Sequence, residues 1–428
     1  MTQLCSPIQT APTELLTEIF KLAMPTRAEL KALGKVSLDT APWVFGRVCA
    51  RWRTIALDMP TLWTSIILAI PYGTAANIAR SFPPALVREH LARSRTLPLD
   101  VLFTSKEEFP ALTTEKVFAV IATAAARWEA LEIESRQPLA FDQLRWNLKR
   151  LRRLCLCPSG LDRIPPPPCV RERDSTGALL WRDVDIGAFI PWTQLVEYTT
   201  TSDELANVDR LREAAASLVS CQFSVDILWT QRTPAVTEFS RLRKLTLTIR
   251  STSFTSPPFL YSLSLPALEE LYVEELGLGG LRPLLRRSGC SLKKLWFYGL
   301  LPRDDFVWIA ENNPHIAELG MVQAGAGSGI DRIMNNLRVA AADAEPLLPA
   351  LRALHILGTE PYFQSIFEML ESRMERGAPL QVLSMHLPRE PKPRYAAMTA
   401  RLKPLKDGGL EVQAMKKLPG GYDLVHFL

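Results

Sequence analysis

The chain has 428 residues, of which 47% are hydrophobic and 22% charged, proportions typical of folded proteins. They provide a large core and exclude wholesale disorder. The 50 Lys and Arg residues outnumber the 45 Asp and Glu residues by only five, and this weak, dispersed charge does not indicate nucleic-acid binding. Seven cysteines, an odd number, disfavour a complete disulfide framework and fit a reducing compartment.

Neither a targeting segment nor a membrane segment is expected. The first ten residues lack the basic start and apolar run of a secretory signal. The longest uncharged stretch, 59–79, contains Pro60, Pro71 and Gly73, whereas a membrane helix needs about 20 more uniformly apolar residues. We therefore expect no membrane partner, and a location in the cytoplasm, the nucleus or both.

The first 70 residues predict three short helices. Apolar residues recur at helical spacing between Pro12 and Pro25 and again between Pro42 and Pro60, and a third element contains Leu62 and Trp63. A unit of this size has a poor core when isolated. Part of its apolar surface is therefore expected to contact either the rest of the chain or another protein.

The order of residues in this region resembles the F-box motif. The matching segments are P-x-E-L-L-x-E-I-F at 12–20, A-P-W-V-F-x-x-V-C-x-x-W-R-x-I-A at 41–56 and P-x-L-W at 60–63. The insert at 26–40 is similar to the version common in mushroom-forming fungi, whereas Ala11 replaces the usual Leu. The resemblance implies a three-helix F-box at 8–68 that docks on the Skp-type linker protein of a cullin-based SCF ubiquitin ligase.

The resemblance also implies which side chains meet the linker protein. How these apolar residues divide between the F-box core and the contact is left open, and Trp63 is expected in the core. The candidate linker contacts are Pro12, Leu15, Leu16, Ile19, Phe20, Val48 and Trp52.

A phrase of the form apolar-x-x-apolar-x-apolar recurs through the remaining chain. Seven of its nine steps are 23–29 residues long, close to the period of a leucine-rich repeat. In such repeats the phrase is a parallel strand whose outer letters enter the core and whose intervening letters line a concave face. The phrase begins at Trp128, Leu151, Leu195, Leu218, Leu242, Leu268, Leu292, Ile316, Leu351 and Leu380, with a weaker copy at Pro98.

The predicted fold class is therefore α/β: an F-box followed by an irregular leucine-rich-repeat solenoid with concave strands and convex helices. Residues 69–95 would form a linker helix region, and 96–428 the degenerate repeats, with a proline-containing insertion loop at about 158–188. The Asn that usually follows the strand is missing, so backbone groups in the turns need other partners. Ordinary α/β alternation is the alternative interpretation.

Together these features predict a substrate-recognition adaptor, whose repeats hold an unknown target protein near the ubiquitin-carrying enzyme. Aromatic side chains are common in binding hot spots. A sheet face without a ligand is the competing interpretation for each residue. The candidate target contacts are Lys244, Glu270, Tyr272, Glu274, Lys294, Trp296 and Tyr298.

Other chemistry is only weakly indicated, and we expect no catalytic residue, cofactor or metal. The Gly-rich turn at 325–329 lacks the G-x-G-x-x-G spacing of a dinucleotide loop. Cys155, Cys157 and Cys169 lack the paired C-x-x-C spacing of a zinc site. The basic cluster 148–153 fits a solvated face or an acidic partner better than nucleic acid. The alternatives are a scaffold outside any ligase, or a nucleotide-using enzyme acting through the 325–329 turn.

Overall fold

The computed structural model describes fifteen stretches of chain and one isolated residue. No helix within them combines the length and the apolar character needed to cross a bilayer. The described residues are 7–27, 29, 40–70, 84–105, 118–135, 147–157, 190–200, 208–226, 235–250, 258–274, 281–298, 301–323, 329–338, 346–358, 363–386 and 393–415.

The chain divides into two compact units, Met1–Arg210 (unit 1) and Leu211–Leu428 (unit 2). This boundary falls inside the 96–428 range assigned to the repeats from sequence. The described part of 69–95 contains the end of a strand and one helix, α7 (Pro84–Arg93). The region that resembles an F-box is therefore a portion of unit 1, which also contains the first five strands of the sheet.

Short helices form the N-terminal part of unit 1, called the head below (residues 7–63). The helix expected between Pro42 and Pro60 is divided at Cys49, whose extended backbone (φ −159°, ψ 170°) interrupts it. The Cys49 Sγ accepts a hydrogen bond from the Trp52 N–H at 3.4 Å and so caps the second part. The head elements are α1 (Pro7–Thr10), α2 (Thr13–Leu22), α4 (Phe45–Val48), α5 (Ala50–Asp58) and the 3₁₀ helix η1 (Pro60–Trp63).

The rest of unit 1 is a ladder of five parallel strands that pair in chain order, with α7 (Pro84–Arg93) between the first two. Short 3₁₀ helices, η2 (Ala125–Arg127) and η6 (Trp192–Gln194), precede two of the strands. The strands are β1 (Ser65–Ile70), β2 (Leu99–Ser105), β3 (Trp128–Ser135), β4 (Arg153–Cys157) and β5 (Glu197–Thr200).

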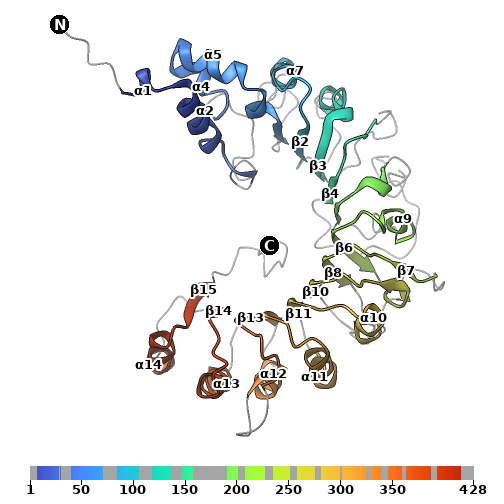
Figure 1. Ribbon diagram of the computed structural model, residues 1–428, viewed down its shortest axis with the longest axis vertical. Coiled ribbons are helices and arrows are strands. Elements are labelled where there is room, and N and C mark those ends of the chain that lie inside the picture. Colours follow the sequence, from blue (N-terminus) through green and yellow to red (C-terminus); the bar gives the residue numbers. More distant parts are fainter. Residues whose placement is uncertain are drawn as a thin grey trace, which may run out of the picture. The chain divides into compact units, whose positions relative to one another are not determined.

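Unit 2 repeats the same plan, and its helices lie on the outer side of a curved row of parallel strands (Figure 1). The ladder contains β6 (Ser220–Asp226), β8 (Lys244–Arg250), β10 (Glu270–Glu274), β11 (Lys294–Tyr298), β12 (Glu318–Gln323), β13 (Ala353–Gly358), β14 (Val382–His386) and β15 (Glu411–Met415). The helices are α9 (Val208–Leu211, at the unit boundary), η7 (Arg212–Ala214), η8 (Pro258–Ser262), α10 (Leu281–Ser288), α11 (Arg303–Asn312), α12 (Gly329–Leu337), α13 (Phe363–Glu375) and α14 (Pro393–Asp407). A small side pair joins β7 (Thr237–Glu238) to β9 (Leu263–Ser264).

All ten phrases found in the sequence form strands of these ladders, as does the weaker copy at Pro98. Equivalent letters of neighbouring phrases are paired, so Leu271 lies beside Leu295 and Leu295 beside Leu319. These outer letters are buried, as expected for a core shared between successive repeats. The α/β class with a large parallel sheet is thus confirmed.

Arginine side chains donate hydrogen bonds to backbone carbonyls close to the starts of several strands. Arg127 donates to the Leu97 carbonyl, Arg287 to the carbonyls of Leu263 and Leu260, and Arg373 to those of Leu347 and Leu348. Each accepting carbonyl lies in the turn that precedes a strand or in the element next to it. The turns that follow the strands, to which the expectation about the missing Asn applies, lie mostly outside the described residues.

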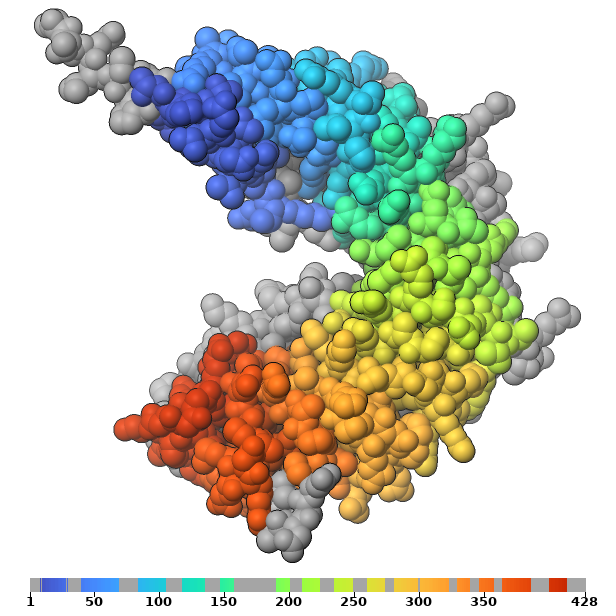
Figure 2. Space-filling view, in the orientation of Figure 1, coloured from blue at the N-terminus to red at the C-terminus, as the bar shows by residue number. Residues whose placement is uncertain are grey.

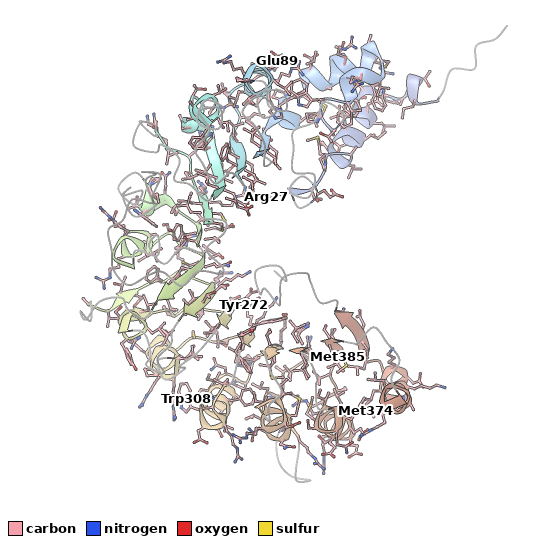
Figure 3. The ribbon with its side chains drawn as sticks, turned by 180° about the vertical axis from the view of Figure 1, so that it is seen from behind. Arg27, Glu89, Tyr272, Trp308, Met374 and Met385 are labelled. Atoms are coloured by element: carbon pink, nitrogen blue, oxygen red, sulfur yellow. The ribbon has the colours of Figure 1, made fainter. Side chains whose placement is uncertain are left out.

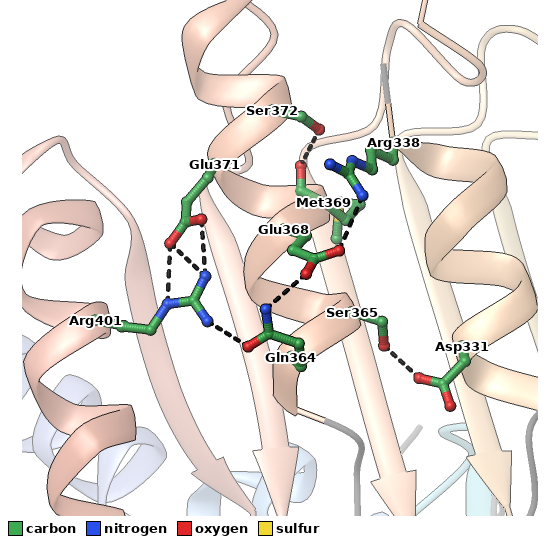
Figure 4. A network of polar contacts seen from close by, with 9 residues as sticks. All are labelled: Asp331, Arg338, Gln364, Ser365, Glu368, Met369, Glu371, Ser372 and Arg401. Atoms are coloured by element: carbon green, nitrogen blue, oxygen red, sulfur yellow. Dashed lines mark hydrogen bonds and ion pairs between the residues drawn. The ribbon is translucent and has the colours of Figure 1, made fainter. Parts of the chain in front are cut away.

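Polar contacts between neighbouring helices reinforce the outer layer of unit 2 (Figure 4). Arg338 pairs with Glu368 at 2.9 Å, and Arg401 pairs with Glu371 at 2.8 Å. The Ser365 hydroxyl donates a hydrogen bond to Asp331. Exposed pairs of this kind contribute about 0–1 kcal/mol each, so the main stabilisation comes from the buried strand letters.

Candidate functional sites

The head has a core of its own. Phe20 and Phe45 stack with ring centroids 4.4 Å apart, and the edge of Trp52 meets Phe20 at 4.9 Å. The Trp63 indole N–H donates to the Ala56 carbonyl at 2.9 Å from within this core, as expected for Trp63.

Two candidate linker contacts are corrected by this packing. Leu16 and Phe20 are completely buried among the head's own residues, so neither is accessible to a partner. Trp52 is half-buried and exposes only part of its ring. Sequence could not separate these residues from their neighbours, because apolar residues occupy both faces of the first helix.

Helix α2 presents a second apolar stripe to solvent. Leu15, Ile19 and Leu22 recur at i, i+4 and i+7, which places them on one face, about 100° from the Leu16–Phe20 face. Leu15 is 57% exposed and Leu22 is 85% exposed. A helix that only covered a core would need a single stripe, so the outer one (the α2 stripe: Leu15, Ile19, Leu22) indicates a further contact.

The α2 stripe belongs to a wider concentration of exposed apolar side chains on the head, which is the dark-blue end of the chain in Figure 2. Pro12 and Val48 are exposed there too. Among the described residues, nine large apolar side chains are exposed, and six of them lie in the head: Ile8, Leu15, Ile19, Leu22, Val48 and Leu57. Contiguous exposed apolar surface is typical of protein-protein contacts, so the head is the first candidate for such a site in this chain.

A salt-bridge cluster that sequence did not indicate ties the segment after α2 to the strands of unit 1. The Arg27 guanidinium donates to Asp100 of β2 at 2.5 Å and to Glu132 of β3 at 2.6 and 3.0 Å. Arg27 itself is labelled in Figure 3. Burial lowers the pKa of Arg27, but the two carboxylates more than offset this and raise it. The partners lie 73 and 105 positions away, so no local pattern could have revealed this clamp.

The second candidate site is the face of unit 2 opposite its helices. Tyr272 lies on this face, whereas Trp308 is carried by α11 on the helix side (Figure 3). Lys244, Glu270, Lys294 and Glu318 follow one another across four paired strands. The Lys294 Nζ lies 3.2 Å from Glu318 and 3.6 Å from Glu270, so these charges largely neutralise one another.

An aromatic row runs beside these charges. Tyr272 and Trp296 occupy paired positions with ring centroids 6.1 Å apart, and Trp296 stacks on His355 at 4.8 Å. Gly320 lies between the last two in register, and a Cβ there would come within 2.0 Å of the Trp296 ring. The Trp296 indole N–H donates to Glu318 at 3.0 Å. The Trp296 ring therefore lies directly against Gly320 of β12, and any residue with a Cβ at that position would clash with it.

Two of the seven candidate target contacts are corrected by this arrangement, and a third lies beyond the described side chains. Tyr272 is 2% and Trp296 5% exposed, so their rings support the face rather than being offered to a target. Burial and Glu270 together raise the pKa of Tyr272, so it remains a neutral phenol. Glu274 ends β10, but its side chain is outside the described ones. Lys244, Glu270, Lys294 and Tyr298 remain partly exposed on the face.

Three features weighed in the sequence fall wholly or mostly outside the described residues. These are the insertion at about 158–188, Cys169, and the 325–329 turn, of which Gly329 begins α12. The Sγ atoms of Cys155 and Cys157 lie 3.4 Å apart on β4. Among the residues that the structure describes, no three His, Cys, Asp or Glu side chains are grouped so as to hold a metal ion.

No protein-family model and no curated protein matches this chain. The fold defines an α/β protein with repeated parallel strands.

Proposed function

We propose that this chain is the substrate-recognition adaptor of an SCF-type ubiquitin ligase. In this proposal the head is an F-box that docks on the Skp-type linker protein, and the parallel strands belong to degenerate leucine-rich repeats that bind a target protein. The adaptor forms no bond itself. It raises the effective concentration of target lysines near the ubiquitin thioester.

The concentration of exposed apolar side chains on the head is the observation that carries the proposal. Leu15, Ile19 and Leu22 remain in water although the adjacent face of the same helix builds a complete core. Burial of these side chains against a partner would contribute roughly 25 cal/mol of favourable free energy for each Å² of apolar surface removed from water. The docking surface proposed here therefore consists of the α2 stripe together with Pro12 and Val48, without Leu16 and Phe20.

For the target, the partly exposed members of the strand face in unit 2 support a polar contact. Lys244, Glu270 and Lys294 are held in place by neighbouring charges and rings, including the Lys244 ammonium over the Tyr272 ring at 5.2 Å. Groups fixed in this way lose little conformational freedom when a partner binds. The proposed target site is this fixed charged row, bordered by Tyr298.

The test is capture of the purified linker protein by the full-length chain. The double variant Leu15→Asp and Ile19→Asp places two charges in the α2 stripe and leaves the head core untouched, so we expect at least a hundredfold loss of affinity. Val236→Asp is the matched control, because Val236 lies in unit 2 and is 58% exposed, close to the value for Leu15. It should bind like the unmodified chain.

Circular dichroism should show the same melting temperature for all three proteins. Equal capture by the double variant would reject this docking surface. Failure of the unmodified chain to bind any linker protein would reject the adaptor role in favour of a scaffold outside the ligase.

A further inference from the structure

Two cysteines of β4 lie on the same face of the sheet in unit 1. Cys155 and Cys157 alternate with two leucines along the strand. These leucines, Leu154 and Leu156, are 4% and 1% exposed and belong to the core. Since side chains two positions apart on a strand share a face, both thiols lie on the face opposite the core. Both cysteines are half-buried there.

The two sulfur atoms are close enough to share one metal ion. The Sγ of Cys155 lies 3.4 Å from the Sγ of Cys157. A zinc–thiolate bond is about 2.3 Å long, so two sulfurs bound to one such ion are at most about 4.6 Å apart, when the three atoms are in line. The observed separation is below this limit, and rotation of the two side chains is enough to set the angle at the ion.

The same spacing disfavours a disulfide bond. Residues two apart on a strand are separated by about 6.6 Å, whereas a disulfide brings the two Cβ atoms to about 3.5–4.5 Å. The bond could form only if β4 buckled, and β4 is held by backbone pairing to β3 on one side and to β5 on the other. An ion that bridges the two sulfurs requires no such movement of the backbone.

The number of available ligands defines the class of ion. Among the residues that the structure describes, no third His, Cys, Asp or Glu side chain joins this pair to form a metal-holding group. Glu132, which pairs in register with Cys155, accepts hydrogen bonds from the Arg27 guanidinium instead. A structural zinc ion takes four ligands, which excludes zinc as the best fit. Thiolates select soft ions such as Cu(I), for which two sulfur ligands are sufficient.

We propose that Cys155 and Cys157 form a binding site for one soft monovalent metal ion of the Cu(I) class. Both thiols release their protons on binding, and each thiolate donates an electron pair to the ion, whose oxidation state does not change. The resulting complex carries one net negative charge. The proposal is independent of the adaptor role, since it concerns neither the α2 stripe nor unit 2.

The test is competition for Cu(I) between the reduced full-length chain and the chromogenic chelator bicinchoninate, in the absence of oxygen. We expect the chain to withdraw one ion from the chelator. Cys155→Ser and Cys157→Ser should each weaken binding at least about a hundredfold, because a single thiolate lacks a second one at high effective concentration. Cys290→Ser is the matched control, since Cys290 is also half-buried but lies in unit 2, and it should bind like the unmodified chain.

X-ray absorption at the copper edge should show sulfur atoms as the nearest neighbours of the ion, and circular dichroism should show that the serine variants are folded. Equal affinity of either β4 variant and the unmodified chain would overturn the proposal, as would a copper shell of nitrogen and oxygen. Absence of Cu(I) uptake by the unmodified chain would overturn it even if the variants failed to fold. Tighter binding of Zn(II) than of Cu(I) would overturn the class of ion.

Discussion

Gly320→Ala is the most direct test of the aromatic row in unit 2. The added Cβ would lie 2.0, 2.2 and 2.5 Å from three atoms of the Trp296 ring, distances that real structures do not tolerate. The ring cannot simply retreat, because it stacks on His355 at 4.8 Å and lies beside Tyr272. It must leave its site and give up its hydrogen bond to Glu318.

Overpacking of a core costs about 1–3 kcal/mol, and loss of a hydrogen bond to a charged group costs a comparable amount. We therefore expect Gly320→Ala to lower the free energy of unfolding of unit 2 by about 3 kcal/mol. In a unit of this size that corresponds to a fall in melting temperature of roughly 6–12 °C. Thermal unfolding followed by circular dichroism measures the change, and hydrogen exchange of β11 to β13 locates it.

The decisive control is the same substitution in a Trp296→Ala background. Without the indole there is no clash, and replacing glycine by alanine within a strand should then be neutral or stabilising by roughly 0.5 kcal/mol. The double-mutant cycle should thus give a coupling energy of about 3 kcal/mol. If Gly320→Ala costs the same in both backgrounds, the reasoning about the ring and the glycine is refuted.

Two buried groups give further predictions. Because the folded pKa of His90 is about 4 and the unfolded value about 6.5, the unfolded chain binds the proton first, and stability present above pH 6.5 is lost as the pH falls toward 4. The loss should reach about 3 kcal/mol in denaturant titrations of unit 1, and an unchanged pH dependence in His90→Gln would contradict this. Arg373→Met removes the donors to the Leu347 and Leu348 carbonyls and should destabilise unit 2 by about 2 kcal/mol in the same assay. Replacement of the exposed Arg286 by Met should lower the free energy of unfolding by less than about 0.5 kcal/mol. If Arg286→Met and Arg373→Met were equally destabilising, the hydrogen bonds of Arg373 to the two carbonyls would not be the cause.

The strands were the most predictable part of the fold. A phrase with fixed buried letters recurs, and stacking forces each copy into the same register. Two strands of the ladders, β1 and β15, were missed for physical reasons. In β1 the run Ser65–Ile70 is almost uniformly apolar and has no alternation. Before β15, Gly409 occupies the place of the first apolar letter, although Val412 and Ala414 fill the other two.

The sites were less predictable because they depend on packing, strand pairing and contacts between residues far apart in the sequence. The exposed α2 stripe and the buried Leu16–Phe20 face are equally apolar in sequence, and only packing distinguishes them. The burial of Trp296 depends on a glycine one repeat further along the chain, hence on the pairing of two strands. Long-range pairs such as Arg27 with Glu132 leave no local trace at all.

The Arg27 clamp also bears on the order in which the chain acquires structure during synthesis. The head helices leave the ribosome early, but the clamp cannot close until β2 and β3 have been translated and paired, more than a hundred residues after Arg27. At about 5–20 residues per second, this delay lasts roughly 5–20 seconds. During that interval a nascent head holds its exposed leucines in water without its anchor, and chaperones would have their best opportunity to bind it.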